Sequence, residues 1–159
     1  MHWGDEYKLK QNSTQEKLAD LLFKNGVDII LGSHPHVLEP MEKRTITLDD
    51  GTTKDGFVIY SLGNFMSGKV IENTRNSIIL NLKITKHSDD TITIDSYNYV
   101  PIYMLDKGSG TTDRYKILDI EKCILNYENG EKNISESLYK TLKKSKEKID
   151  SILSVKENL

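Results

Sequence analysis

The feature that most constrains the fold is a helix pattern followed, after a two-residue turn, by a short aliphatic run. Leucines recur at helical spacing between Ser13 and Gly26, Ser13 and Glu16 have the spacing of a capping box, and Gly26 is a typical C-terminal stop. The run "VDIIL" (27–31) is mostly β-branched and bounded by glycines, which is typical of a buried strand. A helix that leads into a buried strand is half of a βαβ unit. The sequence therefore predicts an α/β fold whose first strand lies before Met1.

The remainder of the chain predicts β-hairpins followed by helices. Two strand-like segments flank the turn signal Asp50-Gly51, and "SIILNLKIT" (77–85) alternates cleanly before a further strand at 91–105. A helical segment near 117–127 precedes a long helix, which Asn133 and Glu136 would open as a capping pair. We expect residues 1–105 to form one α/β unit and residues 106–159 to form an exposed connection and C-terminal helices.

Composition excludes several classes of protein. The formal net charge of −2 gives no support for nucleic acid as the main partner. No run of about 18 apolar residues is present, so no membrane-spanning helix is expected. The single cysteine, Cys123, excludes an intrachain disulfide, and we expect it to be a core residue. The opening "MHWGDEYKLK" has no apolar signal region, so this chain itself is expected to be soluble, without a signal or anchor.

Polar residues collect at three places where a strand should end: "HWGDEY" (2–7), "GSHPH" (32–36) and "YSLGNF" (60–65). Ligands of α/β sheets bind at the carboxyl ends of strands. Pro35 biases the preceding residue toward an extended backbone, in which residues i and i+2 point to the same side. His34 and His36 could then face one metal or two adjacent ones, although a surface loop or a pair of substrate contacts remains an alternative.

His2 is the third candidate metal ligand. Three imidazoles favour borderline transition metals such as Zn, Mn, Fe or Ni, and three histidines with an open position suffice to activate water. Asp5 and Glu6 could support a ligand or act as a general acid, or could be exposed loop carboxylates. Asn64 could bind a metal or a substrate oxygen, or could be ordinary turn chemistry after glycine. His87, in a predicted hairpin loop, is expected to be exposed to solvent.

In this order, "HWGDEY", "GVDIILGSHPHVLEP" and "VIYSLGNF" resemble the C-terminal half of the CapA-type poly-γ-glutamate capsule-synthesis proteins, which belong to the calcineurin-like metallophosphoesterase superfamily. The resemblance covers roughly residues 1–105. It implies an α/β/β/α sandwich with two divalent metals (Mn, Zn or Fe) at the strand ends. "GSHPH" would correspond to the superfamily's Gly-His-x-His metal motif and His2 to the isolated histidine before it. Glu6 and Asn64 match positions in the family's motifs and are the candidate catalytic residues.

The resemblance also limits what this chain can do alone. The superfamily's aspartate ligands and its Asn-His element come from an N-terminal half that has no counterpart here, so a two-metal centre would be incomplete. The implied partners are the capsule-polymer machinery, the missing half or a second copy of the chain. The family is typically anchored at the bacterial cell surface. The leading hypothesis is a truncated capsule-synthesis protein. The alternatives are a non-catalytic surface assembly or polymer-export module, and a metal-dependent phosphodiesterase or nucleotidase of the same fold.

Overall fold

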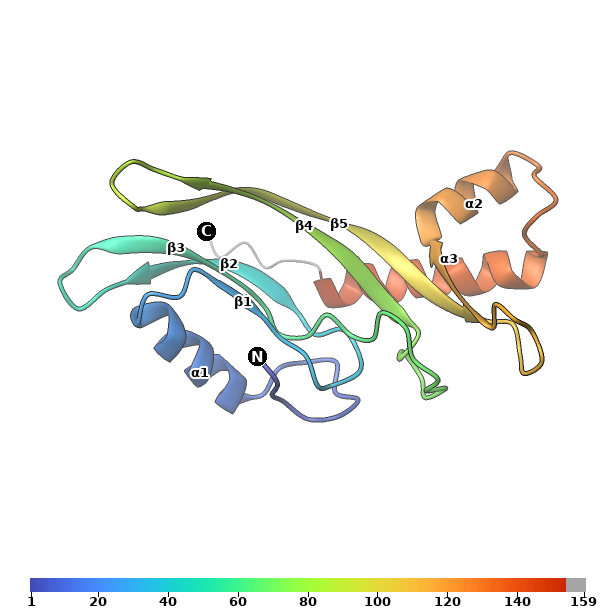
Figure 1. The fold of residues 1–159 in the computed structure, drawn as a ribbon, viewed down its shortest axis with the longest axis horizontal. Coiled ribbons are helices and arrows are strands. Elements are labelled where there is room, and N and C mark those ends of the chain that lie inside the picture. The colour runs from blue at the N-terminus through green and yellow to red at the C-terminus, as the bar shows by residue number, and fades with distance from the viewer. Residues whose placement is uncertain (154–159) are drawn as a thin grey trace.

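The computed structural model describes residues 1–153, which form a mixed α/β fold with two small sheets and three helices (Figure 1). None of these helices combines the length and apolarity needed to cross a membrane. In chain order the elements are α1 (Ser13–Lys24), β1 (Ile29–Leu31), β2 (Met41–Thr47), β3 (Thr53–Ile59), β4 (Asn76–Lys86), β5 (Ile92–Asp106), β6 (Tyr115–Asp119), α2 (Ile120–Glu128) and α3 (Glu136–Leu153).

The first sheet has the strand order β1-β3-β2, and β1 lies within the predicted strand "VDIIL". The predicted burial is confirmed only in part, because β1 is an edge strand in which Ile30 is buried and Leu31 is 47% exposed. β1 pairs in parallel with β3, and β2 pairs antiparallel with β3. The turn between β2 and β3 forms at Asp50-Gly51, as the sequence predicts: Gly51 has φ +83°, and Leu48 N–H donates to the Thr52 carbonyl oxygen at 2.8 Å. The parallel pair β1–β3 places two strand ends at the same edge, which is where the candidate site lies.

The second sheet has the order β4-β5-β6, with both pairings antiparallel. β4 and β5 form a long hairpin whose tip extends over the first sheet, while its base packs on α3 (Figure 1). The predicted strands at 77–85 and 91–105 are confirmed. Residues 115–119, in contrast, form β6 and not the start of a helix, because they pair with the far end of β5. This pairing across the exposed 107–114 loop is not visible in local sequence periodicity.

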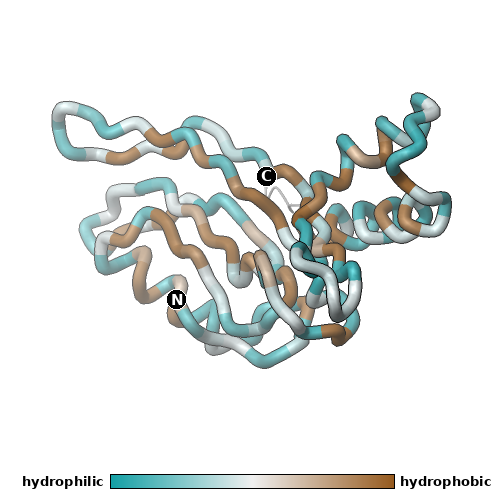
Figure 2. The backbone as a smooth tube through the Cα atoms, turned by 45° about the vertical axis from the view of Figure 1, so that its right-hand side comes forward, coloured by the Kyte–Doolittle hydropathy of each residue, from teal (hydrophilic) through white to brown (hydrophobic). Residues whose placement is uncertain are grey.

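Apolar side chains form two cores, one on each face of the first sheet. The first core lies between this sheet and α1 and contains Phe23 and Val58. The second core lies on the opposite face and joins Phe57 to Ile94 of the hairpin and Ile149 of α3. The apolar stretches of the chain accordingly follow the strands and the inner faces of the helices (Figure 2). Helix α1, the first sheet and the long hairpin thus form three successive layers.

Both predicted helix starts are displaced by one or two residues. The Asn12 side chain caps α1 by accepting from the Thr14 and Gln15 backbone N–H groups, and Gln15 Oε1 accepts from Asn12 N–H. The capping box is therefore Asn12–Gln15 and not Ser13–Glu16. At α3, Ser135 Oγ accepts from the Leu138 N–H, so this hydroxyl caps the helix in place of the predicted Asn133. Asn and Ser are equally good N-caps, and only the backbone register decides between neighbours.

Candidate functional site at the ends of β1 and β3

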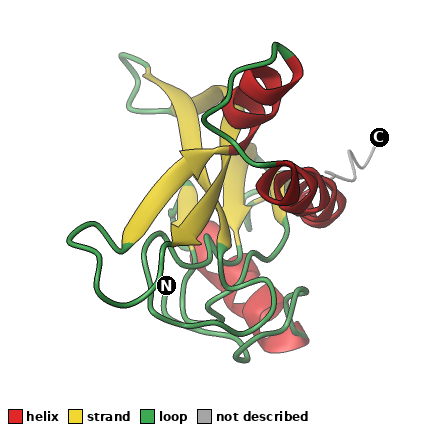
Figure 3. Cartoon of the chain, turned by 90° about the vertical axis from the view of Figure 1, so that its right-hand side faces the viewer, coloured by secondary structure: helices red, strands yellow, loops and turns green. Residues whose placement is uncertain are grey.

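The three polar segments predicted from the sequence come together at one edge of the first sheet. β1 ends directly before "GSHPH" and β3 directly before "YSLGNF", and the two strands are parallel. The N-terminal segment lies in the same group of loops (Figure 3). The parallel pairing therefore accounts for the convergence of segments that are about 30 residues apart in sequence.

The first three residues run beside the loop that follows β1. The Met1 ammonium donates to the Leu31 carbonyl oxygen at 2.7 Å, Ser33 N–H donates to the Met1 carbonyl oxygen at 2.8 Å, and Trp3 N–H donates to the Ser33 carbonyl oxygen at 3.1 Å. His2 and Ser33 consequently form a parallel bridge. These backbone bonds hold His2 next to the other two candidate histidines.

Trp3 and Gly32 form the buried floor of this region. The Trp3 side chain is 7% exposed, and its indole Nε1–H donates to the Tyr60 carbonyl oxygen at 2.8 Å. A Cβ atom at Gly32 would lie 1.8 Å from that same oxygen and 2.6 Å from Trp3 Nε1. Glycine is therefore required at position 32 because the backbones of the two strand ends approach too closely for any side chain.

His36 is the best-connected histidine of the site. Its Nδ1 lies 2.9 Å from Asn64 Oδ1, and Asn64 Nδ2 in turn donates to the Thr74 carbonyl oxygen at 3.3 Å. Since Oδ1 can only accept, His36 donates from Nδ1 in this pairing, and in the neutral ring Nε2 then carries the lone pair. Nε2 lies 3.6 Å from Glu6 Oε1, and the Tyr7 ring stacks on the imidazole at 5.9 Å between centroids. Asn64 thus orients His36.

His34 lies between the other two histidines. Its ring centroid is 4.4 Å from that of His2 and 6.4 Å from that of His36. The backbone differs from the predicted extended geometry, because φ is +107° at His34 and +63° at His36. The chain bends at residues 34–37, and the Tyr7 N–H of the N-terminal segment holds this bend by donating to the Pro35 carbonyl oxygen at 2.8 Å. The bend overrides the preference for an extended residue before proline.

The three imidazoles are close together, but their ligand atoms do not converge. Within residues 1–153, no three His, Cys, Asp or Glu side chains are arranged so that they could hold a metal ion. As placed, these residues do not fit a complete metal centre. Asp5, the alternative supporting group, points to the helix cap instead, where its Oδ2 accepts from Asn12 Nδ2 at 2.8 Å. His87 lies in the hairpin loop and is exposed, as predicted.

A cation completes the polar surface beside His36. Lys69 Nζ lies 2.6 Å from the Tyr7 hydroxyl and 5.1 Å from the centre of its ring. The hydrogen bond with Tyr7 raises the pKa of Lys69 above its ordinary value, so the ammonium stays charged. The site therefore presents an imidazole, a carboxylate, an amide and an ammonium within one group of loops.

Glu39 is a buried carboxyl that the sequence reasoning missed. It is fully buried; Gln15 Nε2 donates to its Oε2 at 2.7 Å, and its Oε1 has no hydrogen-bond partner among the described residues. Burial raises the pKa of Glu39 from 4.5 to about 7; the hydrogen bond from Gln15 opposes this shift, and the charge of Asp5 adds to it. The available signal was a charged residue inside the otherwise apolar "VLEP" (37–40).

Comparison with known proteins finds a similarity to one family. Residues 1–69 match the family model of the bacterial capsule synthesis proteins (PGA_cap), and this segment contains all three site motifs. Over this segment the chain is similar to that family of CapA-type proteins.

Two curated relatives show a similarity of the same kind. The PGA biosynthesis protein CapA of Bacillus subtilis is 40% identical over 86 residues, which are 54% of this chain and 20% of that protein. The capsule biosynthesis protein CapA of Bacillus anthracis is 38% identical over 79 residues, which are 50% of this chain and 17% of that protein. The match thus spans about a fifth of the length of these relatives. No solved structure matches the chain.

Proposed function

We propose that the chain acts in the biosynthesis of a poly-γ-glutamate capsule, as the names of its CapA relatives say of them. One observation carries the proposal: the matched segment, residues 1–69, supplies the His-rich loops that the fold gathers at the ends of β1 and β3. The fold would be part of a metallophosphoesterase-like α/β/β/α sandwich. The layering of α1, the first sheet and the long hairpin is in keeping with this arrangement. The family's cell-surface location and the capsule machinery as partner are part of the same proposal.

Metal binding by His2, His34 and His36 stays a prediction. Its support is the proximity of the three rings and the Asn64 contact at His36 Nδ1, which leaves Nε2 of the neutral ring as the ligand atom. Calorimetric titration with Zn²⁺ or Mn²⁺ tests it: we expect weak binding that His34→Ala abolishes. Equal heats from the wild type and from the His34→Ala, His36→Ala double variant would contradict it.

Deletion and complementation in the native host test the capsule role. We expect deletion to reduce cell-associated γ-linked glutamate polymer, measured as glutamate released from purified polymer by acid. The wild-type sequence should restore it and His36→Ala should not. His87→Ala is the matched control, because this exposed histidine lies in a hairpin loop away from the site motifs. Unchanged polymer in the deletion strain would refute the proposal.

Enzyme assays of the wild type and His36→Ala, read together with the polymer assay, distinguish the two alternative functions. A metal-dependent hydrolase predicts turnover of a nitrophenyl phosphodiester that depends on added Mn²⁺ or Zn²⁺ and is lost in His36→Ala. A non-catalytic assembly or export module predicts no turnover, although polymer formation still requires the chain. We expect no appreciable turnover, since the described His, Cys, Asp and Glu side chains form no group that could hold a metal, and loss of even one electrostatic contact at a reacting centre costs about 10²–10³ in rate.

A further inference from the structure

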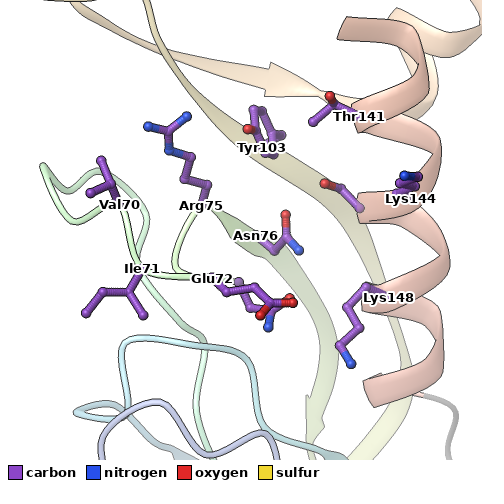
Figure 4. A pocket seen from close by; sticks show the side chains of 11 residues that line it. Val70, Ile71, Glu72, Arg75, Asn76, Tyr103, Thr141, Lys144 and Lys148 are labelled. Atoms are coloured by element: carbon purple, nitrogen blue, oxygen red, sulfur yellow. The ribbon is translucent and has the colours of Figure 1, made fainter. Parts of the chain in front are cut away.

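A cavity of about 560 Å³ lies outside the family-matched segment, between the 70–75 loop, the start of β4, β5 and α3 (Figure 4). Its volume falls within the range of about 300–1,000 Å³ that is usual for small-ligand sites. The lining residues come from segments about 70 positions apart, which only the packing of α3 on the hairpin base brings together. The pocket shares no lining residue with the histidine site.

Three cations line this pocket and are poorly neutralised. Arg75 lies 4.0 Å from Asp106, but that carboxylate is already held by Arg114, whose Nε and Nη2 donate to its two oxygens at 2.8 and 3.0 Å. On α3, Lys144 and Lys148 face the pocket, and neither forms an ion pair with another described residue. The one acidic group in the lining is Glu72, which is exposed. The pocket therefore attracts anions.

Two polar side chains with little exposed surface line the pocket. Asn76 is 7% exposed and Ser145 is 8% exposed, and neither side chain forms a hydrogen bond with another described residue. Neither is among the fully buried groups without a partner, so their polar atoms still reach the solvent in the pocket. The Asn76 amide points into the cavity toward α3 (Figure 4). A ligand in the pocket can therefore replace water as the hydrogen-bond partner of this amide and this hydroxyl.

The chemistry of these groups selects the ligand. Arginine and lysine pair with carboxylates, whereas the Asn76 amide offers both a donor and an acceptor. Inorganic phosphate and sulfate act mainly as acceptors and would leave the amide oxygen unpaired. A chain that alternates carboxylates with amide links satisfies both kinds of group.

We propose that this pocket binds a segment of an amide-linked polycarboxylate chain, with Arg75, Lys144 and Lys148 pairing its carboxylates and Asn76 pairing its amides. The identification of that chain as γ-linked glutamate rests on the proposed function, whereas the pocket chemistry does not. The site would hold the polymer away from the histidine loops, on a surface that the family model does not cover.

Calorimetric titration of the chain with short γ-linked oligoglutamate, α-linked oligoglutamate and inorganic phosphate tests the proposal. We expect saturable binding of the γ-linked oligomer that weakens with added salt. Lys148→Glu and Asn76→Asp should each weaken it at least about tenfold, as expected for loss of a charge-assisted hydrogen bond, and Glu72→Gln should strengthen it. Lys17→Glu, on the exposed face of α1, is the charge-matched control and should bind normally. Thermal melts establish that each variant is folded, and the surface variant Lys148→Glu carries the test if Asn76→Asp is not.

Each outcome of the titrations either supports or overturns the proposed polycarboxylate pocket. Equal binding of α- and γ-linked oligomers with the same variant pattern supports the pocket as a general polycarboxylate site. Absent binding of both oligomers, unchanged affinity in Lys148→Glu, or phosphate binding as tight as that of the oligomers overturns the proposal. The polymer assay in the native host tests the capsule role separately. If the γ-linked oligomer binds as expected but deletion leaves the polymer unchanged, the capsule role alone is refuted. If the oligomer does not bind but deletion reduces the polymer, the pocket proposal alone is refuted.

Discussion

Replacing Glu39 with glutamine should make the stability of the protein less dependent on pH. Glu39 is fully buried, accepts one hydrogen bond from Gln15 and leaves its other oxygen unpaired. Glutamine has nearly the same shape and can still accept from Gln15 through its own carbonyl oxygen, but it carries no charge at any pH. The substitution therefore isolates the cost of ionising the buried carboxyl.

The direction of the pH effect on stability follows from whether the folded or the unfolded chain holds the Glu39 proton. Below pH 4.5 both the folded and the unfolded chain carry the proton, so Glu39 imposes no ionisation penalty. As the pH rises from 4.5 to about 7, the unfolded chain ionises while the folded chain retains its proton, and stability falls. A pKa raised from 4.5 to about 7 corresponds to a loss of roughly 3 kcal/mol, complete above the folded pKa.

Urea unfolding followed by circular dichroism measures this loss. We expect the free energy of unfolding of the wild type to fall by about 2–3 kcal/mol more between about pH 5 and pH 8 than that of Glu39→Gln. At the higher pH the variant should be the more stable protein. Glu147→Gln, an exposed position on α3, is the control and should follow the wild type. Parallel pH profiles for wild type and Glu39→Gln would refute the reasoning, because they would mean that the carboxyl ionises at no extra cost.

The same unfolding assay tests three contacts of the fold. Gly32→Ala should cost more than about 3 kcal/mol, because its Cβ would lie 1.8 Å from the Tyr60 carbonyl oxygen and neither backbone can yield cheaply; a loss under about 1 kcal/mol would contradict this contact. Ile149→Ala should cost about 2–5 kcal/mol since the side chain is fully buried, and an unchanged midpoint would mean that α3 does not pack on the hairpin. Tyr60→Phe removes the hydroxyl that donates to Glu42 at 2.9 Å and should cost about 1–2 kcal/mol; a more stable variant would contradict a stabilising role for this hydrogen bond.

The sequence predicts the parts of the fold that local pattern determines. The helix before "VDIIL", the turn at Asp50-Gly51 and the alternating strand at 77–85 are all confirmed, since periodicity and turn chemistry are local properties. Strand β6 was missed because its order comes from pairing with β5 across an exposed loop. The predicted caps of α1 and α3 were wrong for a similar reason. Capping depends on the backbone register, and adjacent Asn, Ser and Asp residues are chemically equivalent candidates.

At the candidate site, sequence predicts which residues meet but not how they are oriented. His2, His34 and His36 come together because parallel strand ends share an edge, a rule that can be applied from sequence. The orienting contact of Asn64 with His36 and the burial of Glu39 depend on side-chain packing, which residue spacing does not encode. The polycarboxylate pocket lies still further from sequence reasoning, because Asn76 and Ser145 carry no motif and acquire meaning only when α3 docks on the hairpin.

The left-handed backbone at His34 and His36 makes glycine an unusually informative replacement there. Most truncations remove a side chain and weaken the fold together, so a lost phenotype is ambiguous. At φ +107° and +63° an L-residue is conformationally disfavoured, whereas glycine adopts these angles freely. A His36→Gly allele should therefore delete the imidazole while relaxing the chain that carries it. Because such an allele removes the ring and leaves the backbone conformation favourable, it would separate folding from function in a single codon.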